Sequence, residues 1–356
     1  MIVNDLVKHQ NPWISLDRET GIVVSSRVRL ARNLRDHAFP GWAGEKERER
    51  LCLEATEACR KVPRLADAVV LDMAGLGELD RELLKERHLI SVEFAERREG
   101  SALVLSRDEH IAIMVNEEDH LRMQAIAPGL CLQETWREID SVDTEMEKHL
   151  RYAHSPTLGY LTACPTNVGT GLRASVMVHL AGLRLTGDFD RAMKGLTRLG
   201  LAVRGLFGEG SEAYGGMVQV SNQSTLGESE QAILERLLGI VQDLVVHERN
   251  ARARLVERNR IVALDQVSRA LAILKHARLI SSMEAVELLS MLRLGVDLKL
   301  VAGVSEAGIN EMLLMTQPGH LQMHFGRKLD LKERDRMRAE FVAERLRDAD
   351  VVERRR

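Results

Sequence analysis

The chain has 356 residues, of which 45% are hydrophobic and 29% are charged, and its formal net charge is −3. This composition is typical of a folded globular protein of about two domains, and it excludes extensive disorder. The balanced charge also argues against general nucleic-acid binding, so that any anion site has to be a local cluster of Lys and Arg side chains.

Short β-like runs and amphipathic helices follow one another irregularly between residues 22 and 222. Helices are expected near residues 45–62, 78–88, 135–152 and 188–199. Strands are predicted for the runs rich in branched residues, which are GIVVSSRVRL, AVVLDM, ALVLSR, HIAIMVN, ASVMVHL, LAVRGLF and MVQVSN. Because several strands follow one another without a helix between them, the pattern predicts an α+β domain with a largely antiparallel sheet.

After residue 228 the sequence carries helical apolar spacing and few strand features. We therefore expect an N-terminal segment (1–21), a main α+β domain (22–250) and an all-α C-terminal domain (251–356). From the pattern alone, the C-terminal domain is a packing or dimerisation module.

The four cysteines, Cys52, Cys59, Cys131 and Cys164, form no C-x-x-C pair, which argues against a zinc knuckle or a disulfide framework. The N-terminus lacks a secretory pattern, and nowhere do about 18 apolar residues run together. These features predict free thiols, a cytoplasmic location and no membrane partner.

Residues 169–174, GTGLRA, have the G-x-G-x-x-A spacing of a dinucleotide-binding turn. Such a turn opens a helix, but the residues that follow Arg173 alternate between apolar and largely polar types with period two. The spacing therefore predicts a turn that enters a strand. A Walker A loop is excluded because the dipeptide Gly-Lys is absent, and the H-R-D loop of protein kinases is absent as well.

Arginines recur at strand positions. Arg27 and Arg29 are two residues apart, which directs both side chains to one face of a strand about 7 Å apart. Arg122, Arg173 and Arg204 also lie in predicted strands or at their ends. One strand arginine is usually a surface residue, but five beside turns indicate a cradle for triphosphate, whose oxygens match guanidinium groups.

Two segments supply carboxylates. Residues 116–120, NEEDH, follow a predicted strand, and the glycine-rich segment 205–216 contains Glu209 and is typical of a loop that closes over a substrate. NEEDH is also compatible with a simple polar turn. A phosphate cradle beside two carboxylates would suit a cationic phosphoryl acceptor.

At these residues the chain resembles the ATP:guanidino phosphotransferases, and most closely the bacterial protein-arginine kinases. The resemblance rests on six blocks in the family order, SSRVRLARN, KERHLIS, VNEEDHLRMQ, GYLTACPTNVGTGLRASVM, RGLFGEGSEAYGG and QVSNQ. It implies the phosphagen kinase catalytic fold, related to that of glutamine synthetase, followed by the helical domain.

The resemblance implies roles for individual residues. Glu118 resembles the catalytic base, Glu209 its partner, and Cys164 the thiol that lies against the substrate guanidinium. It also implies ATP and Mg²⁺ as cofactors, with the metal held through ATP and no separate metal site. The implied ATP contacts are Ser25, Ser26, Arg27, Val28, Arg29, His88, Arg122, Arg173, Ala174, Ser175, Val176, Met177, Arg204, Gly205, Leu206, Phe207, Gly208 and Glu209.

The C-terminal domain contains a further block, RDRMRA, which resembles the allosteric phosphoarginine motif of the protein-arginine kinases. It comprises Arg334, Asp335, Arg336, Met337, Arg338 and Ala339. On a helix, positions 334 and 338 share a face, so two guanidinium groups could hold one phosphoryl group. Without the resemblance, the block would be read as a solvated charge run.

Three functions remain open from the sequence. The first is a kinase of arginine side chains in proteins, which the resemblance links to a homodimer, a zinc-containing activator, a heat-shock repressor and Clp-type degradation. The small-molecule relatives carry a helical domain before the first ATP block, whereas 24 residues precede Ser25 here; we therefore expect an open acceptor pocket. The second is a kinase of free arginine or another small guanidine. The third is an adaptor without turnover that binds phosphoarginine proteins or nucleic acid through the last helix.

Overall fold

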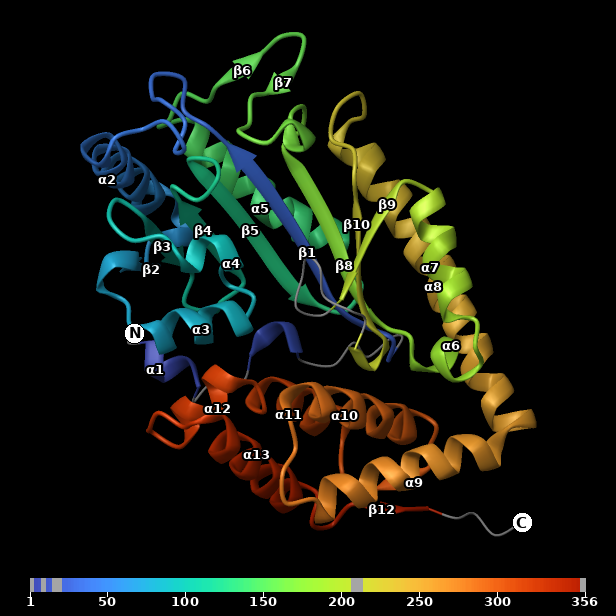
Figure 1. The fold of residues 1–356 in the computed structure, drawn as a ribbon. Coiled ribbons are helices and arrows are strands. Elements are labelled where there is room, and N and C mark those ends of the chain that lie inside the picture. The colour runs from blue at the N-terminus through green and yellow to red at the C-terminus, as the bar shows by residue number, and fades with distance from the viewer. Residues whose placement is uncertain (1–2, 8–10, 15–20, 206–213, 353–356) are drawn as a thin grey trace.

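The computed structural model describes residues 3–7, 11–14, 21–205 and 214–352, and its main feature is one eight-stranded antiparallel sheet (Figure 1). The strand order is β2-β3-β4-β5-β1-β8-β10-β9. The strands are β1 (Val23–Arg32), β2 (Val69–Asp72), β3 (Ala102–Leu105), β4 (Ile111–Val115), β5 (Leu121–Pro128), β8 (Leu172–His179), β9 (Leu201–Gly205) and β10 (Met217–Asn222). Two small two-stranded antiparallel sheets pair β6 (His154–Ser155) with β7 (Gly159–Tyr160) and β11 (Val301–Ala302) with β12 (Asp350–Val351).

One face of the sheet is covered by long helices. These are α2 (Glu45–Lys61), α5 (Leu132–Glu147) and α8 (Glu230–Arg258), and α7 (Phe189–Arg198) packs beside β9. Alternate strand residues such as Val28, Leu30 and Val176 point to this side and are fully buried against the helices. The largest hydrophobic core therefore lies on one side of the sheet.

The other face is covered only at its edges. At the β2–β4 end it packs against α1 (Val3–Leu6), α3 (Glu78–Glu86) and α4 (Val92–Ala95). At the Val24 end of β1 it packs against the helical domain. Figure 1 shows these two coverings at the left and below, and no helix of the described residues lies over the middle of this face, at β5, β1, β8 and β10.

The helical domain is built around α10, which packs against α9 and α11. Its helices are α9 (Arg260–His276), α10 (Ser282–Asp297), α11 (Glu306–Met315), α12 (Pro318–His324) and α13 (Leu331–Arg345). The helix α8 runs from the sheet into this domain without a break, so the boundary expected at residues 250 and 251 falls inside α8. No helix in the described ranges is long and apolar enough to cross a membrane.

The seven strands expected from the sequence are all present, but the sequence reading missed β5. Its alternation of Leu121 and Met123 with Arg122 and Gln124 was a usable period-two pattern. The helix expected at residues 135–152 is α5, which begins and ends earlier. The fold class, an antiparallel α+β domain followed by a helical domain, is confirmed.

The turn at residues 169–174 enters strand β8, as the alternation after Arg173 predicted. Gly169 and Gly171 both have positive φ. A Cβ atom on Gly171 would lie 2.6 Å from the carbonyl oxygen of Ala31, and one on Gly169 would collide with the carbonyl oxygen of Thr225. These glycines are therefore required by close backbone packing.

A buried ion pair joins the end of β1 to α5. The Nη2 and Nε atoms of Arg32 lie 2.6 and 3.0 Å from Asp143 Oδ2, and both side chains are buried. Arg32 also donates to the carbonyl of Thr170 at 2.9 Å, and its guanidinium carbon lies 3.5 Å from the centre of the Tyr160 ring. Arg32 thus ties the strand, the helix and the turn before β8 together.

We expect Asp143→Ala to lower the free energy of unfolding by about 3–5 kcal/mol, because it leaves the Arg32 charge buried without a partner. The matched control is Asp36→Ala, which breaks the exposed Asp36–Arg151 pair and should cost less than about 1 kcal/mol. Urea unfolding followed by circular dichroism measures both. Equal losses in the two variants would contradict the anchoring role of Arg32.

Candidate active site

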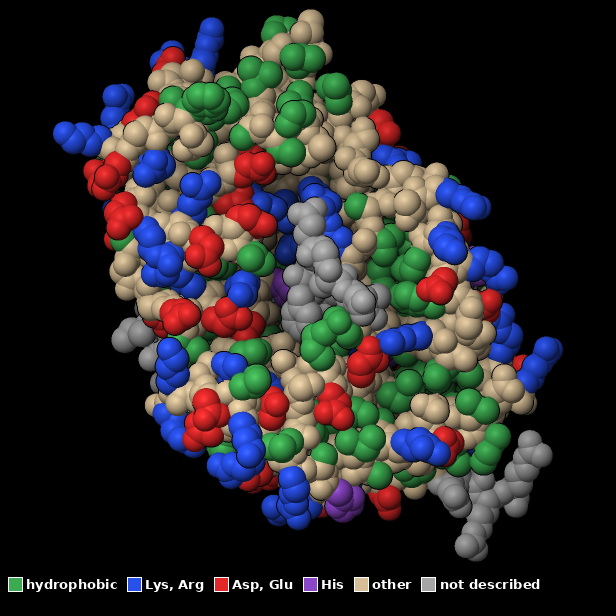
Figure 2. Space-filling view, in the orientation of Figure 1, with side chains coloured by type: hydrophobic (Ala, Val, Ile, Leu, Met, Phe, Trp, Pro, Cys, Tyr) green, Lys and Arg blue, Asp and Glu red, His purple; other side chains and the backbone are tan. Residues whose placement is uncertain are grey.

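Cross-strand register places all five arginines of the prediction on the uncovered face of the sheet. Arg29 lies opposite Arg173 on β8, and Arg122 on β5 lies opposite Ala31, two residues further along β1. Arg204 on β9 lies opposite Gln219 on β10, whose neighbour on β8 is Met177. Figure 2 shows Lys and Arg side chains gathered in a central hollow, with Asp and Glu side chains at its upper left rim.

Arg27 and Arg29 form no ion pair with a carboxylate among the described residues, whereas Arg122 pairs with Glu117. Arg27 Nη2 donates to Gln219 Oε1 at 3.1 Å. Arg29 is 9% exposed, and its Nε and Nη2 atoms are buried without a hydrogen-bond partner among the described residues. Two buried, unsatisfied donors on a cation are costly unless an anion binds to them.

Mutual repulsion strengthens this conclusion. Burial, followed by the charges of Arg122, Arg173 and Arg204, lowers the pKa of Arg27 to about 9. Burial and the neighbouring arginines also lower the pKa of Arg29 well below its ordinary value. Burial and the charges of Arg27 and Arg29 lower the pKa of His88 to about 3, so that His88 is neutral. The arrangement is suited to an anion with several negative charges.

The acidic turn between β4 and β5 presents one carboxylate and holds two others. Glu117 is buried, accepts hydrogen bonds from Arg122 and Ser91, and also accepts from the backbone N–H of Glu118. Asp119 is buried and accepts from Asn33 Nδ2 and from the backbone N–H of Ala163, both at 2.6 Å. Glu118 is exposed at the rim of the site.

These environments shift the pKa values of Glu118 and Glu117 in opposite directions. Partial burial, followed by the charges of Asp119 and Glu117, raises the pKa of Glu118. Burial works to raise the pKa of Glu117, but Arg122 and the hydrogen bonds to its carboxylate outweigh it, and the net shift is downward. Glu118 is therefore the acid of this turn that is both accessible and adjusted toward proton transfer.

Cys164 is carried on a turn that Asp119 fastens to the acidic turn. The hydrogen bond from Ala163 to Asp119 involves the residue next to Cys164, and Thr162 Oγ1 donates to the carbonyl of Cys164 at 2.7 Å. The sulfur lies 3.0 Å from Thr166 Oγ1 at the start of a short 3-10 helix, Pro165–Asn167. The sulfur-bearing turn and the acidic turn thus form one rim of the site.

Other residues of the predicted ATP blocks divide between the two faces. Ser25, Ser175 and Met177 line a pocket on the arginine face with Arg27 and His88. In contrast, the side chains of Val28, Ala174 and Val176 point into the core, because they alternate with the arginines and Ser175.

Ser26 also faces away from the arginines. Its hydroxyl donates to Gly129 O and accepts from the backbone N–H of Cys131. The side chains of Ser26, Val28, Ala174 and Val176 therefore cannot contact a ligand on the arginine face. Gly205 ends β9, and Leu206, Phe207, Gly208 and Glu209 lie outside the described residues.

Three residues that the sequence reading missed belong to this region. Gln219 could have been found, because it alternates with Val218 and Val220 on the strand next to Arg173. Asp119 was part of the acidic block, but its role depends on partners distant in sequence. Trp13 lines the pocket with His88, and nothing in its local sequence indicated this.

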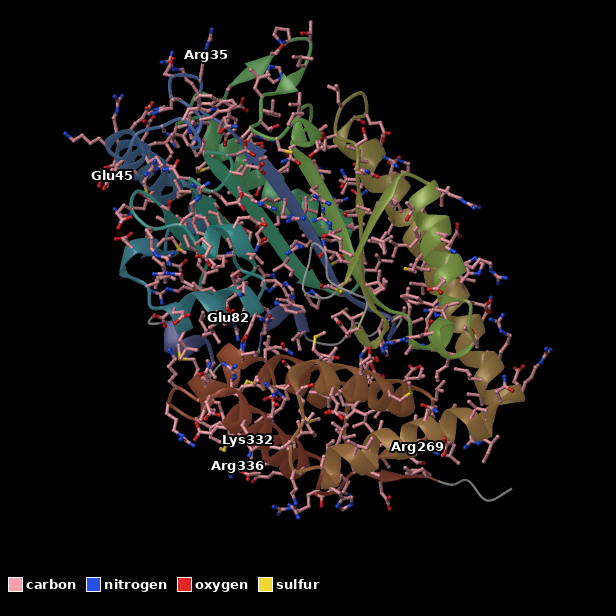
Figure 3. The ribbon with its side chains drawn as sticks, viewed as in Figure 1. Arg35, Glu45, Glu82, Arg269, Lys332 and Arg336 are labelled. Carbon is pink, nitrogen blue, oxygen red and sulfur yellow. The ribbon has the colours of Figure 1, made fainter. Side chains whose placement is uncertain are left out.

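The RDRMRA block lies on α13, and its arginines differ in how far they are exposed to solvent. Arg338 is 1% exposed, and its guanidinium donates to the carbonyls of Thr316 and Ile280 and to Asp335. Arg336 is exposed at the outer edge of α13 and pairs with Glu340 (Figure 3). Arg338 is therefore already held by protein groups. The expectation that the guanidinium groups of Arg334 and Arg338 hold one phosphoryl group stays a prediction.

Two family models match successive parts of the chain. Residues 54–251 match the family model described as ATP:guanido phosphotransferase, C-terminal catalytic domain, and residues 260–355 match the model described as Protein-arginine kinase McsB C-terminal domain. The chain is 45% identical to a protein-arginine kinase of Brevibacillus brevis, with 95% of this chain and 96% of that one aligned. It is 44% identical to a protein-arginine kinase of Bacillus cereus, with 97% and 98% aligned.

Among solved structures, a lombricine kinase is similar, with a TM-score of 0.59 and 25% identity over 66% of this chain and 68% of that one. A duplicated taurocyamine kinase from Schistosoma mansoni, with bound components of a transition-state analogue, has a TM-score of 0.58 and 25% identity over 69% of this chain and 38% of that one. The part shared with these structures is about two thirds of the chain.

We expect inorganic tripolyphosphate to stabilise the protein by about 2.7 kcal/mol at a concentration 100-fold above its Kd. Arg29→Gln should weaken this binding about 10- to 100-fold, because it removes charge-assisted hydrogen bonds. Without the anion, the same variant should unfold at the same or a higher temperature than the parent, because a buried, repelled cation is gone.

Thermal unfolding with and without tripolyphosphate measures both effects of Arg29→Gln. The matched control is Arg191→Gln on α7, where the side chain is 84% exposed, and it should change neither quantity. Unaltered tripolyphosphate binding by Arg29→Gln would show that the cluster is not the anion site.

Proposed function

The chain belongs to the ATP:guanido phosphotransferase family, as a protein-arginine kinase, and on this premise we propose that its arginine face transfers the γ-phosphoryl group of ATP to arginine side chains of proteins. The observation that carries this proposal is an arginine cluster in which the buried Arg29 keeps two donors without a partner among the described residues, beside one accessible carboxylate, Glu118. A polyanion and a cationic acceptor are the two substrates that such a site can bring together.

The arginines bind and orient the triphosphate. Their guanidinium groups donate to phosphate oxygens and offset the charge that spreads over the transferring phosphoryl group. Arg29 offers the donors that the protein leaves unpaired, and Arg27, held by Gln219, points its charge to the same side. Catalysis by this cluster consists of positioning and electrostatic stabilisation.

Mg²⁺ would be held through the phosphate oxygens of the nucleotide, because Glu117 and Asp119 are already held by Arg122 and Asn33. Within the described ranges, no group of three or more His, Cys, Asp or Glu side chains could hold a metal ion. When bound, the ion would neutralise part of the phosphate charge.

Glu118 acts on the acceptor. A guanidinium is a poor nucleophile, because its lone pairs are delocalised and it carries an extra proton. Glu118 orients the group and accepts one proton while a nitrogen forms the P–N bond and ADP leaves. Glu209 is proposed as a second orienting carboxylate, and Cys164, on the turn fastened to Asp119, as the group beside the guanidinium.

A protein acceptor is favoured over a free guanidine because the similarity to protein-arginine kinases covers nearly the whole chain, whereas the similarity to the lombricine kinase structure covers about two thirds of it. The relatives named protein-arginine kinase align with the chain over its helical domain as well as its sheet. The alternative, a kinase of free arginine or a related small guanidine, has its support in the shared catalytic fold.

The family resemblance also supports finer proposals about the setting of this activity. The modification would mark proteins for Clp-type degradation and regulate a heat-shock repressor in the cytoplasm, as part of a stress response. A homodimer and a zinc-containing activator would be its partners. Arg334, on the same helix face as the buried Arg338, would be the main contact of a regulatory phosphoarginine.

With Mg-ATP we expect acid-labile phosphate on arginine side chains of an unfolded protein substrate, measured by mass spectrometry. Glu118→Gln should lower the rate by about 10²- to 10⁴-fold, because it removes the group that accepts the proton. The exposed Glu57→Gln on α2 is the matched control and should keep the parental rate. Phosphate on free arginine alone would overturn the proposed acceptor, and an unchanged rate in Glu118→Gln would overturn the proposed base.

The pH dependence provides a separate check on Glu118. As a base it must be deprotonated, so kcat/KM falls when the pH drops through its raised pKa. Asp119→Asn removes a neighbouring negative charge that raises this pKa, so the acidic limb of kcat/KM should move to lower pH. Asp67→Asn, a change of an exposed acid distant from the site, should leave the limb in place. A limb that moves to higher pH in Asp119→Asn would rule out Glu118 as the titrating group.

A further inference from the structure

The buried residues of the acidic turn fasten three surface elements around Glu118, and the first of these is α4. Ser91, the N-cap of α4, donates to the carboxylate of Glu117. Arg97, just after α4, donates from Nη2 to the carbonyl oxygen of Glu117 at 2.8 Å. That carbonyl belongs to the peptide group that precedes Glu118, so α4 is held directly against the residue that carries the exposed carboxylate.

Helix α4 presents an apolar and an acidic side chain at this point. Val92 at its first position is 54% exposed, and the next residue, Glu93, is exposed as well. Burial contributes most to the raised pKa of Glu118, and the charge of Glu93 adds to it. The exposed start of α4 therefore lies within electrostatic reach of the Glu118 carboxylate.

The second element is the loop between β1 and α2, which His120 holds. The Nδ1 atom of His120 accepts from the backbone N–H of Leu34 at 2.9 Å, and Nε2 lies 2.9 Å from the carbonyl oxygen of Ala38. The ring of Phe39 packs edge-on against the same imidazole. Trp42 on this loop is 90% exposed, so the loop adds a large apolar side chain to the surface.

The third element is the sulfur-bearing turn together with the β6–β7 pair that precedes it. Asp119 accepts from the backbone N–H of Ala163, and the same carboxylate is joined through Asn33 to the carbonyl oxygen of Leu161. Leu158, between β6 and β7, is 46% exposed. Figure 2 shows hydrophobic side chains along the upper margin of the central hollow, next to the Asp and Glu side chains.

We propose that Trp42, Val92 and Leu158 form an apolar rim that docks an unfolded polypeptide segment whose arginine lies at Glu118. Large apolar side chains exposed on several elements beside one polar group are typical of an interaction surface, and an exposed Trp is a common anchor. This inference rests on the proposed function, and it adds a preference for apolar residues on both sides of the acceptor arginine. Such residues are buried in a folded protein, so the rim selects unfolded segments.

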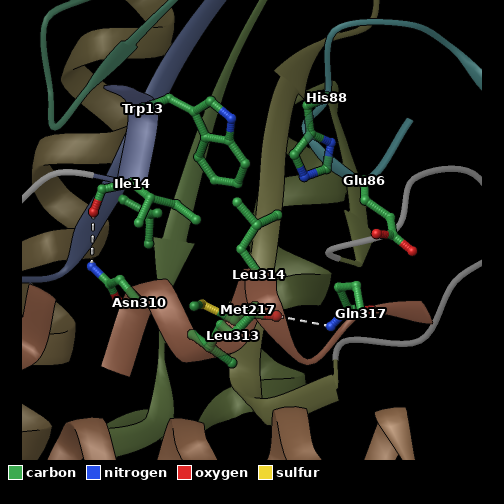
Figure 4. Close-up of a pocket in the computed structure, with 10 residues that line it drawn as sticks. Trp13, Ile14, Glu86, His88, Met217, Asn310, Leu313, Leu314 and Gln317 are labelled. Carbon is green, nitrogen blue, oxygen red and sulfur yellow. Dashed lines mark hydrogen bonds between the residues drawn. The ribbon is translucent and has the colours of Figure 1, made fainter. Parts of the chain in front are cut away.

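The occupant is the acceptor chain because the apolar rim adjoins Glu118, at the acidic end of the site. The pocket lined by Trp13, Leu314 and Asn310, whose amide donates to Ile14, lies at the other end of β1 (Figure 4). In an extended chain, the side chains two residues before and after an arginine lie about 7 Å from it and point to the same side. Apolar residues at these two positions would therefore face the rim while the arginine faces Glu118.

Two acceptor peptides of equal length and charge test this docking surface. Each has one arginine, and the residues two positions before and after it are leucines in one peptide and serines in the other. With Mg-ATP, we expect kcat/KM of the parent to be about 10-fold higher for the leucine peptide, because partial burial of apolar side chains favours binding. The difference should lie in KM, since the chemistry at Glu118 is the same for both peptides.

Trp42→Ser should raise KM for the leucine peptide about 5- to 10-fold and leave kcat for both peptides, and KM for the serine peptide, unchanged. Because the Trp42 side chain is 90% exposed, its removal leaves no cavity. The matched control is Leu199→Ser at the end of α7, where the side chain is 57% exposed, and it should keep the parental preference.

The outcomes separate this inference from the proposed function. A parent that uses both peptides equally, or a Trp42→Ser variant that retains the full preference, would overturn the docking surface while the kinase activity stands. Phosphorylation of free arginine and of neither peptide would overturn both.

A binding measurement on the parent adds an independent check. Trp42 is exposed, whereas Trp13 is 4% exposed, so acrylamide should quench mainly the emission of Trp42. A saturating concentration of the leucine peptide should reduce this quenching in the parent and not in Trp42→Ser. Quenching that the peptide leaves unchanged in the parent would rule out a contact between Trp42 and the acceptor.

Discussion

The repulsion among clustered, largely desolvated arginines is the constraint on which the rest of this structure depends. Five guanidinium groups share one face of a sheet, and burial together with their mutual charge lowers the pKa of Arg27 to about 9. Folding brings these charges together at a cost, so the stability of the domain has to come from elsewhere. It comes from the opposite face, where alternate residues of the same strands pack against α2, α5 and α8.

A comparison of two arginines on β1 distinguishes a structural cation from a binding one. Arg32 and Arg29 are both buried, but they point to opposite faces of the sheet. Arg32 meets the carboxylate of Asp143 and the ring of Tyr160, and so its charge is neutralised within the protein. Within the described ranges Arg29 pairs with no carboxylate, and two of its buried donors have no partner there. Both arginines are buried, but only Arg32 has a carboxylate partner there. Arg29 is therefore the one that can bind an anionic ligand.

Local sequence was sufficient to predict the features that follow from period-two alternation, namely strands and the faces to which their side chains point. It predicted seven of the eight strands of the main sheet, the shared face of Arg27 and Arg29, and the strand that follows the turn at residues 169–174. It did not identify which acid of residues 116–120 is accessible, because that depends on Arg122, Asn33 and Ala163, and the family resemblance supplied Glu118. The hydrogen bond from Asn310 to Ile14 spans 296 residues, and no local pattern could have indicated it.

The ends of the site differ in a way that bears on its acceptor. At the Ser25 end of β1 the site adjoins a largely apolar pocket lined by Trp13 and by residues of α11. At the Arg32 end lie the acidic turn and the turn that carries Cys164, and Glu118 there is exposed to solvent. A side chain still attached to a protein can approach only an exposed carboxylate. The accessibility of Glu118 is therefore the feature of this site that best accommodates arginine within a polypeptide.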